Sequence, residues 1–252
     1  MIHCRYLVIA ALLALVPPAS AESIPRIAII IDDLGYQLEA GRRAIELPGP
    51  VAYAILPGTP SGRALAETAH RNGKEVLLHL PLEAIAYRGP AEPGGITLDM
   101  SRSVFQETFA AALMSVPFAI GVSSHRGSLL TRHPGHMEWL MEEIRSREGL
   151  FFVDSYTTHE SVALQIAAEA GVVATKRDVF LDNDRSEEAL AFEFERLQTL
   201  ARIHGVAMGI GHPYPETLAF LERELQALDD EEIALVSVSE LMRIVAGGIG
   251  AP

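Results

Sequence analysis

Residues 26–35, RIAIIIDDLG, contain the clearest indication of the fold class. An aliphatic run from Ile27 to Ile31 ends abruptly in Asp32 and Asp33, and Gly35 follows. Such a run, bounded by polar residues and glycine, predicts a parallel strand that is buried on both faces. In α/β folds, ligands gather at the carboxyl ends of such strands, so we expect the two aspartates at a functional site. The alternative is that one of them caps the next helix.

Similar apolar runs recur along the chain, and segments with the pattern of amphipathic helices separate them. We predict further strands near residues 50–56, 74–78, 118–122, 150–153, 172–174, 206–210 and 234–236. No linker, repeat or low-complexity stretch interrupts this alternation, which indicates a single domain. About seven to eight mainly parallel strands that alternate with helices predict a distorted or incomplete (β/α) barrel of the α/β class.

The first residues have the features of a secretory signal peptide over residues 1–21. Arg5 precedes an apolar run at residues 6–16, and a small-x-small cleavage pattern ends at Ala21. We therefore expect a mature domain over residues 22–252 that is periplasmic or secreted. No later apolar run has the length of a membrane span, so no membrane insertion is expected after cleavage. The only cysteine, Cys4, lies in the leader, which excludes a disulfide in the mature chain.

The net negative charge of the chain argues against two classes of binding partner, nucleic acids and anionic lipids. The formal net charge is −13, and it becomes −14 when Arg5 is removed with the leader. An acidic chain disfavours nonspecific binding to nucleic acid or to anionic lipid. Neutral or cationic ligands remain, and the oligomeric state is left open.

Polar side chains that follow the predicted strands converge if the sheet is a barrel, because the carboxyl ends of all strands then meet on one face. These side chains belong to Asp32, Asp33, His79, His125, Asp154 and His212. His79 and His125 with the Asp33 carboxylate would form a set of two histidines and one carboxylate with open positions for water. A hydrolytic zinc site needs such a set. No dinucleotide fingerprint or phosphate loop follows any strand.

Four further residues are candidates for orienting a ligand or contacting a substrate: Glu83, Ser128, Asp154 and Arg177. Pro81 argues against a shared helical face for His79 and Glu83, so Glu83 is the weaker ligand and is expected to orient a neighbour. Asp154 and Arg177 either orient a ligand or cap a helix. Gly127 beside Ser128 suggests backbone close to a ligand, although glycine is also common in turns.

Five motifs in a fixed order run through nearly the whole mature chain. They are Ile31-Asp32-Asp33-Leu34-Gly35, His79-Leu80-Pro81-Leu82-Glu83, His125-Arg126-Gly127-Ser128, Asp154-Ser155 and Gly211-His212-Pro213-Tyr214-Pro215-Glu216-Thr217. Together they resemble the divergent polysaccharide deacetylases, an offshoot of the polysaccharide deacetylase superfamily. That superfamily has a distorted (β/α) barrel and removes acetyl groups from sugars with a divalent metal.

The resemblance implies roles for the matching residues. Asp32 would be the general base, Asp33 a metal ligand, and His212 the group that protonates the leaving group or steadies the oxyanion. Glu83 stands where the superfamily has the second histidine of a His-x-x-x-His pair, so His125 is expected to complete the ligand set. Arg126 replaces a methionine that is common in the family, and it either contacts an anionic substrate group or faces solvent.

These expectations combine into a functional hypothesis. The chain would be an exported, metal-dependent deacetylase-like hydrolase in which a water activated by the metal, with zinc as the expected ion, attacks an acetyl group of a polysaccharide. Two alternatives remain open at this point. One is a catalytically inactive envelope protein that binds glycan or regulates a cell-wall enzyme, and the other is a hydrolase of a different ester or amide.

Overall fold

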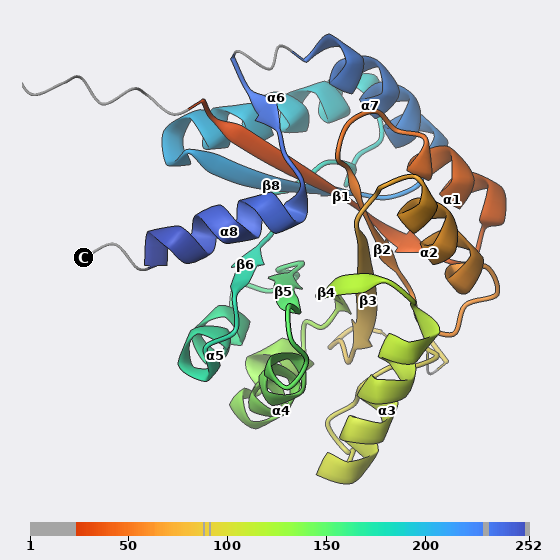
Figure 1. Cartoon of the computed structure of the whole chain (residues 1–252), viewed down its shortest axis with the longest axis vertical. Coiled ribbons are helices and arrows are strands. Elements are labelled where there is room, and N and C mark those ends of the chain that lie inside the picture. Colours follow the sequence, from red (N-terminus) through yellow and green to blue (C-terminus); the bar gives the residue numbers. More distant parts are fainter. Residues whose placement is uncertain (1–23, 88, 91, 229–231, 250–252) are drawn as a thin grey trace, which may run out of the picture.

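A curled sheet of parallel strands forms the centre of the fold, and helices cover its outer side (Figure 1). The computed structural model describes residues 24–87, 89–90, 92–228 and 232–249. The predicted leader at residues 1–21 lies outside these ranges. Among the helices of the described ranges, none combines the length and the apolar character that a bilayer crossing requires.

The strands of the described residues are β1 (Arg26–Leu34), β2 (Ala52–Ile55), β3 (Val76–Leu82), β4 (Ala119–Arg126), β5 (Phe151–Asp154), β6 (Ala174–Lys176), β7 (Val179–Phe180), β8 (Val206–Gly211) and β9 (Ala234–Leu235). Their order in the sheet is β6-β5-β4-β3-β2-β1-β8-β7, and β9 pairs with β1. Every pairing is parallel. The two edge strands, β6 and β7, do not pair with each other, so the sheet is an incomplete barrel. The predicted fold class is therefore confirmed.

The helices are α1 (Leu38–Ile45), α2 (Gly62–Arg71), α3 (Arg102–Ser115), α4 (Pro134–Arg145), α5 (Ala163–Ala170), α6 (Glu187–His204), α7 (Pro215–Ala227) and α8 (Val238–Ile249), with a short 3-10 helix at Leu130–Arg132. Local sequence signals explain several boundaries. The Ser101 and Ser186 side chains accept hydrogen bonds from backbone amides in the first turns of α3 and α6. Proline opens α4 and α7, where its missing N–H costs nothing.

Strand β1 is buried on both faces because it lies in the middle of the sheet, between β2 and β8. Ile27, Ile29 and Ile31 pack in the large core between the sheet and the helices on its outer side. Ala28 and Ile30 face a second, smaller core, which α8 closes with side chains that include Leu241 and Met242. The continuous aliphatic run therefore reflects two apolar faces, as the sequence predicts.

Three strands continue beyond the apolar runs from which they were predicted. β1 includes both aspartates, β3 includes His79, and β4 includes His125. The three candidate metal ligands therefore belong to strands, whereas His212 directly follows β8. Strand β7, helix α8 and the 3-10 helix were not predicted, and β7 and the 3-10 helix have only two and three residues.

Candidate metal centre

A bulge in β1 directs both aspartates to the same site. Ile31 pairs with Tyr53 and Leu34 with Ile55, so β1 has one more residue than β2 in this interval. Asp33 adopts the left-handed backbone conformation, with a φ of 62°. Consecutive strand residues normally point to opposite faces. Here both carboxylates lie near the His79 ring, with oxygens 3.6 Å (Asp32) and 3.2 Å (Asp33) from its Nε2 atom.

Three donor atoms from β1, β3 and β4 converge on one point. Asp33 Oδ1 lies 3.2 Å from His79 Nε2 and 2.9 Å from His125 Nδ1, and the two nitrogens are 3.2 Å apart. A tetrahedral zinc ion with ligand bonds of roughly 2.0–2.1 Å holds its ligand atoms about 3.3 Å apart. The three atoms therefore have nearly the separation that such an ion requires. The structure brings together the three residues that the sequence suggested as ligands.

Unsatisfied oxygens support the same interpretation. Asp33 Oδ1 is buried and accepts no hydrogen bond of good geometry from the described residues, although two imidazole nitrogens lie within 3.2 Å of it. Asp32 Oδ1 is also buried without a hydrogen-bond partner in that part of the chain. Buried carboxylate oxygens are normally paired or bound to a cation. Two imidazoles, one carboxylate and unpaired oxygens fit a divalent ion with an open coordination position.

A hydroxyl on the far side of the His79 ring fixes its orientation, and the charges around the centre shift the pKa values of His79 and Asp33. His79 Nδ1 lies 2.8 Å from Ser123 Oγ, which leaves Nε2 directed to the centre. Burial opposes protonation of His79, but the charges of Asp32 and Asp33 outweigh it and raise the pKa of this imidazole. The same contacts act in reverse on Asp33: burial disfavours its ionisation, yet His125 and His79 together hold its pKa well below the usual range. Asp33 is therefore ionised and suited to bind a cation.

The other aspartate, Asp32, has a different environment. It is buried, and the nearest hydroxyl is Ser155 Oγ, 3.5 Å from Asp32 Oδ2. Burial raises the pKa of Asp32, although the charges of His79 and His212 oppose this effect. A carboxylate with a raised pKa is a better proton acceptor than an ordinary surface aspartate. The two adjacent carboxylates thus differ chemically, as a base and a ligand would.

His212 lies near the second carboxylate oxygen of Asp33 and is held by Asp182. Its Nδ1 is 2.9 Å from Asp182 Oδ1, and its backbone N–H donates to Asp182 Oδ2 over 2.6 Å. Thr217 Oγ1 donates to the same oxygen over 2.9 Å. Burial lowers the pKa of His212, but the hydrogen bond and charge of Asp182 outweigh it, so the pKa is raised. His212 Nε2 faces Asp33 Oδ2 at 3.7 Å and can carry a proton to the site.

Asp182 was missed from the sequence, although a signal for it exists. It follows the short apolar run of β7 and Leu181, which repeats the pattern of β1 and Asp32 on a smaller scale. Its side chain is completely buried.

Glu92 and Arg126 adjoin the outer side of His125. His125 Nε2 accepts a hydrogen bond from Arg126 Nε over 2.9 Å and lies 3.4 Å from Glu92 Oε1. Arg126 also pairs with Glu92 at 3.2 Å and lies over the Tyr87 ring. The Arg126 side chain is 35% exposed, and its guanidinium group is paired with Glu92, so an anionic substrate group would compete with this carboxylate. Glu92 lies in a loop rich in proline and glycine, where no periodic pattern marks it.

Glu83 and Ser128 support loops next to the centre. Glu83 Oε2 accepts from the Leu98 backbone N–H over 2.7 Å, and Ser128 Oγ accepts from the Ile85 N–H over 3.1 Å. Neither side chain belongs to the converging ligand group. Glu83, which replaces the second histidine of the superfamily motif, therefore holds the backbone at Leu98 and is not among the converging ligands.

Asp154 and Arg177 hold the segment that follows β5. Asp154 accepts hydrogen bonds from Ser124, Ser161 and the Tyr156 backbone. Arg177 donates to the carbonyls of Ser155 and Tyr156, over 2.8 and 3.1 Å. The Ser155 hydroxyl lies 3.5 Å from Asp32 Oδ2. Asp154 and Arg177 therefore hold the backbone that positions Ser155 beside Asp32.

A small cavity of about 250 Å³ opens beside the centre, lined by Asp33 and His212 among others. Tyr36 and Tyr214 also line it, and their side chains are 54% and 39% exposed. One candidate metal ligand, Asp33, and the proton carrier His212 thus border an accessible cavity that two tyrosines also line.

Comparisons with known proteins agree with this arrangement. The model of the family described as divergent polysaccharide deacetylase matches residues 29–242. The uncharacterized protein YibQ of Escherichia coli is 35% identical over 236 residues, which cover 94% of this chain and 72% of that protein. An uncharacterized protein of Agrobacterium tumefaciens, solved by crystallography, is 26% identical with a TM-score of 0.83, over 89% of this chain and 92% of its own.

A more distant likeness concerns the fold alone. A mutant of the peptidoglycan deacetylase PdaC from Bacillus subtilis has a TM-score of 0.53 at 11% identity, covering 90% of this chain and 93% of its own. The family match extends over most of the sequence and includes all the converging residues. The chain therefore belongs to the divergent polysaccharide deacetylase family.

Proposed function

We propose that the chain is an exported, metal-dependent hydrolase that removes acetyl groups from a polysaccharide. The observation that carries this proposal is the convergence of Asp33 Oδ1, His79 Nε2 and His125 Nδ1 within 3.2 Å of one another. Asp32 and His212 flank this group on two sides. Its family membership supports a polysaccharide as the substrate class.

The roles of the side chains follow from their environments. A divalent ion held by Asp33, His79 and His125 would polarise an acyl carbonyl and lower the pKa of a water molecule. Asp32, with its raised pKa, accepts the proton of the attacking water. Asp182 accepts a hydrogen bond from His212 Nδ1, and its charge favours the imidazolium form, in which Nε2 also carries a proton. His212 donates this Nε2 proton to the leaving nitrogen or oxygen. Tyr36 and Tyr214 offer flat, partly apolar surfaces to a sugar ring beside the cavity.

The proposed location outside the cytoplasm rests on residues 1–21. Arg5, the apolar run and the cleavage pattern before Glu22 are the features of a signal peptide. Zinc is the metal we propose, because two imidazoles and one carboxylate suit it.

The test is to express the full chain with its leader and to purify the exported protein. Metal content is measured by elemental analysis, and acetate release is measured with N-acetylglucosamine oligomers, acetylated xylan and simple acetate esters. We expect near-stoichiometric metal and acetate release from at least one acetylated glycan that stops on chelation. A protein that takes up no metal in excess zinc and releases no acetate would contradict the proposal, and glycan binding alone would favour the inactive alternative.

Glu92→Gln is expected to weaken metal binding by about 10–100-fold. If His125 binds a metal ion through Nδ1, its ring proton lies on Nε2, which can then no longer accept the hydrogen bond from Arg126 Nε. The Glu92 carboxylate, 3.4 Å from Nε2, would accept this proton instead and fix the ring. The affinity is measured by competition with a chromogenic chelator. Glu83→Gln is the matched control, because Glu83 supports a neighbouring loop and contacts no ligand. Equal losses in the two variants would show that Glu92 has no special role.

A further inference from the structure

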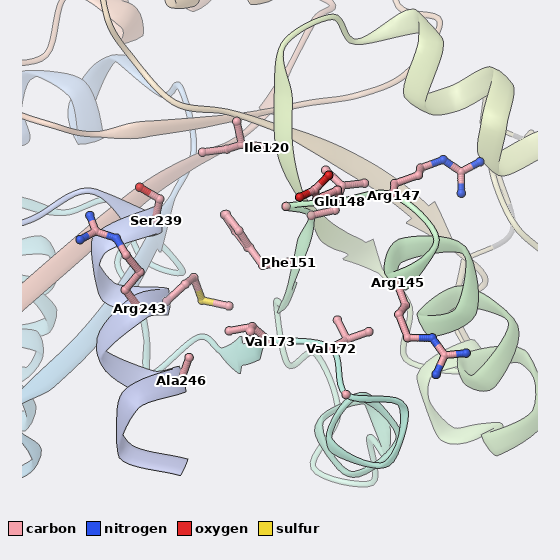
Figure 2. A pocket seen from close by; sticks show the side chains of 14 residues that line it. Ile120, Arg145, Arg147, Glu148, Phe151, Val172, Val173, Ser239, Arg243 and Ala246 are labelled. Carbon is pink, nitrogen blue, oxygen red and sulfur yellow. The ribbon is translucent and has the colours of Figure 1, made fainter. Parts of the chain in front are cut away.

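An open groove lies at the end of the sheet opposite the metal centre. Figure 2 shows the side chains that line it. Its volume is about 610 Å³, and the starts of β4, β5 and β6 form one side while α8 forms the other. The metal ligands occupy the opposite, carboxyl ends of β1, β3 and β4. The floor of the groove is apolar and includes Ile120, Phe151, Val172, Val173, Met242 and Ala246.

The groove exists because the barrel is incomplete. Phe151 and Met242 belong to the small core between the sheet and α8, so this core continues to the surface at the groove. Val173, just before edge strand β6, leaves 36% of its surface exposed. An apolar core that reaches the surface next to an edge strand is a typical place for a partner to bind.

Positive charge surrounds the apolar floor. Arg145, Arg147 and Arg243 line the groove with a single acidic residue, Glu148, although the whole chain has a net charge of −13. Arg147 is occupied by Glu143, at 2.8 Å. Arg145 and Arg243 are exposed, and within the described ranges Arg243 has no ion-pair partner while Arg145 makes one long hydrogen bond of 3.4 Å. Figure 2 shows them on opposite sides of the floor, with both guanidinium groups directed outward.

The openness of the groove decides which kind of ligand it suits. A bound small molecule is usually buried over most of its surface. Here Arg145, Arg243 and Ala246 are exposed, so a small molecule would remain largely in water. A longer segment can cover the floor and reach both arginines at once. We propose that the groove binds an acidic, amphipathic segment of another protein, with apolar side chains on Val173 and Met242 and carboxylates facing Arg145 and Arg243.

This interaction does not depend on the proposed hydrolase activity. The partner would occupy the amino ends of the strands and leave the metal centre accessible. A second copy of this chain is a poorer occupant, because the predicted mature chain has a net charge of −14 and two copies would repel each other. Binding of a partner in the groove and hydrolysis at the metal centre can therefore be tested separately, and either can be absent while the other is present.

The experiment uses the full chain in the cells that produce it. Val173 is replaced by the photoreactive residue p-benzoylphenylalanine, the cells are illuminated, and the linked peptide is identified by mass spectrometry. We expect an adduct with a different protein, through a segment in which apolar residues alternate with aspartate or glutamate. Arg145→Glu with Arg243→Glu should remove the adduct and weaken binding of the corresponding synthetic peptide about tenfold or more.

Arg202→Glu is the matched control, because Arg202 is exposed on α6 and does not line the groove. It should leave the adduct unchanged, and so should loss of metal through Asp33→Asn. The pair Arg145→Gln and Arg243→Gln repeats the test if charge reversal lowers the melting temperature. The proposal is overturned by the absence of any adduct, by an adduct only with a second copy, by a linked segment without acidic residues, or by an adduct that the double variants do not weaken.

Discussion

Asp33→Asn is expected to lower metal affinity by at least about 100-fold and to abolish turnover, because even the loss of a group that only supports a ligand costs up to that much. The carboxylate oxygen of Asp33 lies between two imidazole nitrogens and supplies the negative charge of the proposed ligand set. Asparagine keeps the shape of the side chain and tolerates the φ of 62° better than alanine would. The variant therefore removes charge without straining the bulge.

Asp32→Asn provides the comparison, since the two residues are adjacent and differ only in their surroundings. We expect this variant to retain the metal and to lose turnover by about 10²–10⁴-fold, the usual contribution of a general base. Elemental analysis and acetate release are measured on both proteins. If both variants keep the metal, or if both lose it equally, the separate roles assigned to the two carboxylates are wrong.

Asp182→Asn is expected to shift the pH dependence of the reaction and to lower kcat by about 10²–10⁴-fold. In the folded protein the pKa of His212 is raised, so its proton is retained above the ordinary titration range of histidine and is lost as the pH rises through that higher pKa. Without the Asp182 charge this pKa falls. The basic limb of the kcat/KM profile should therefore move to lower pH, while metal content is unchanged.

Thr217→Val separates charge from positioning in the same cluster. Thr217 donates to Asp182 Oδ2, so its replacement disturbs the carboxylate and leaves its charge in place. The basic limb should then stay where it is in the parent protein. A profile that does not move in Asp182→Asn would show that His212 is not the proton donor.

Much of the fold could be predicted because a strand that is buried on two faces is a continuous aliphatic run in the sequence. The run from Ile27 to Ile31 is one example, and it indicates a central parallel strand without any knowledge of the neighbouring strands. The alternation of similar runs with helical segments was enough for an incomplete barrel. Strand β7 could not be found in this way, since two residues are too few to form a pattern.

The candidate site was predictable where ligands follow long strands and not where they depend on packing between loops. Asp33, His79 and His125 lie at such strand ends. Glu92 reaches His125 from a loop whose position is set by distant contacts, so spacing along the chain carries no information about it. The left-handed conformation of Asp33, which turns both aspartates to one side, is equally invisible in the sequence.

The position of β1 in the sheet also determines when the domain can form during synthesis. Arg26 pairs with Val206 in β8 and with Ala234 in β9, although these residues are separated by most of the chain. Contacts between such distant segments form slowly, because a long loop must close before they stabilise anything. The central strand therefore lacks two of its three neighbours until the ribosome has made the last strands. We expect the nascent chain to stay open and prone to aggregation until then, and to depend on chaperones.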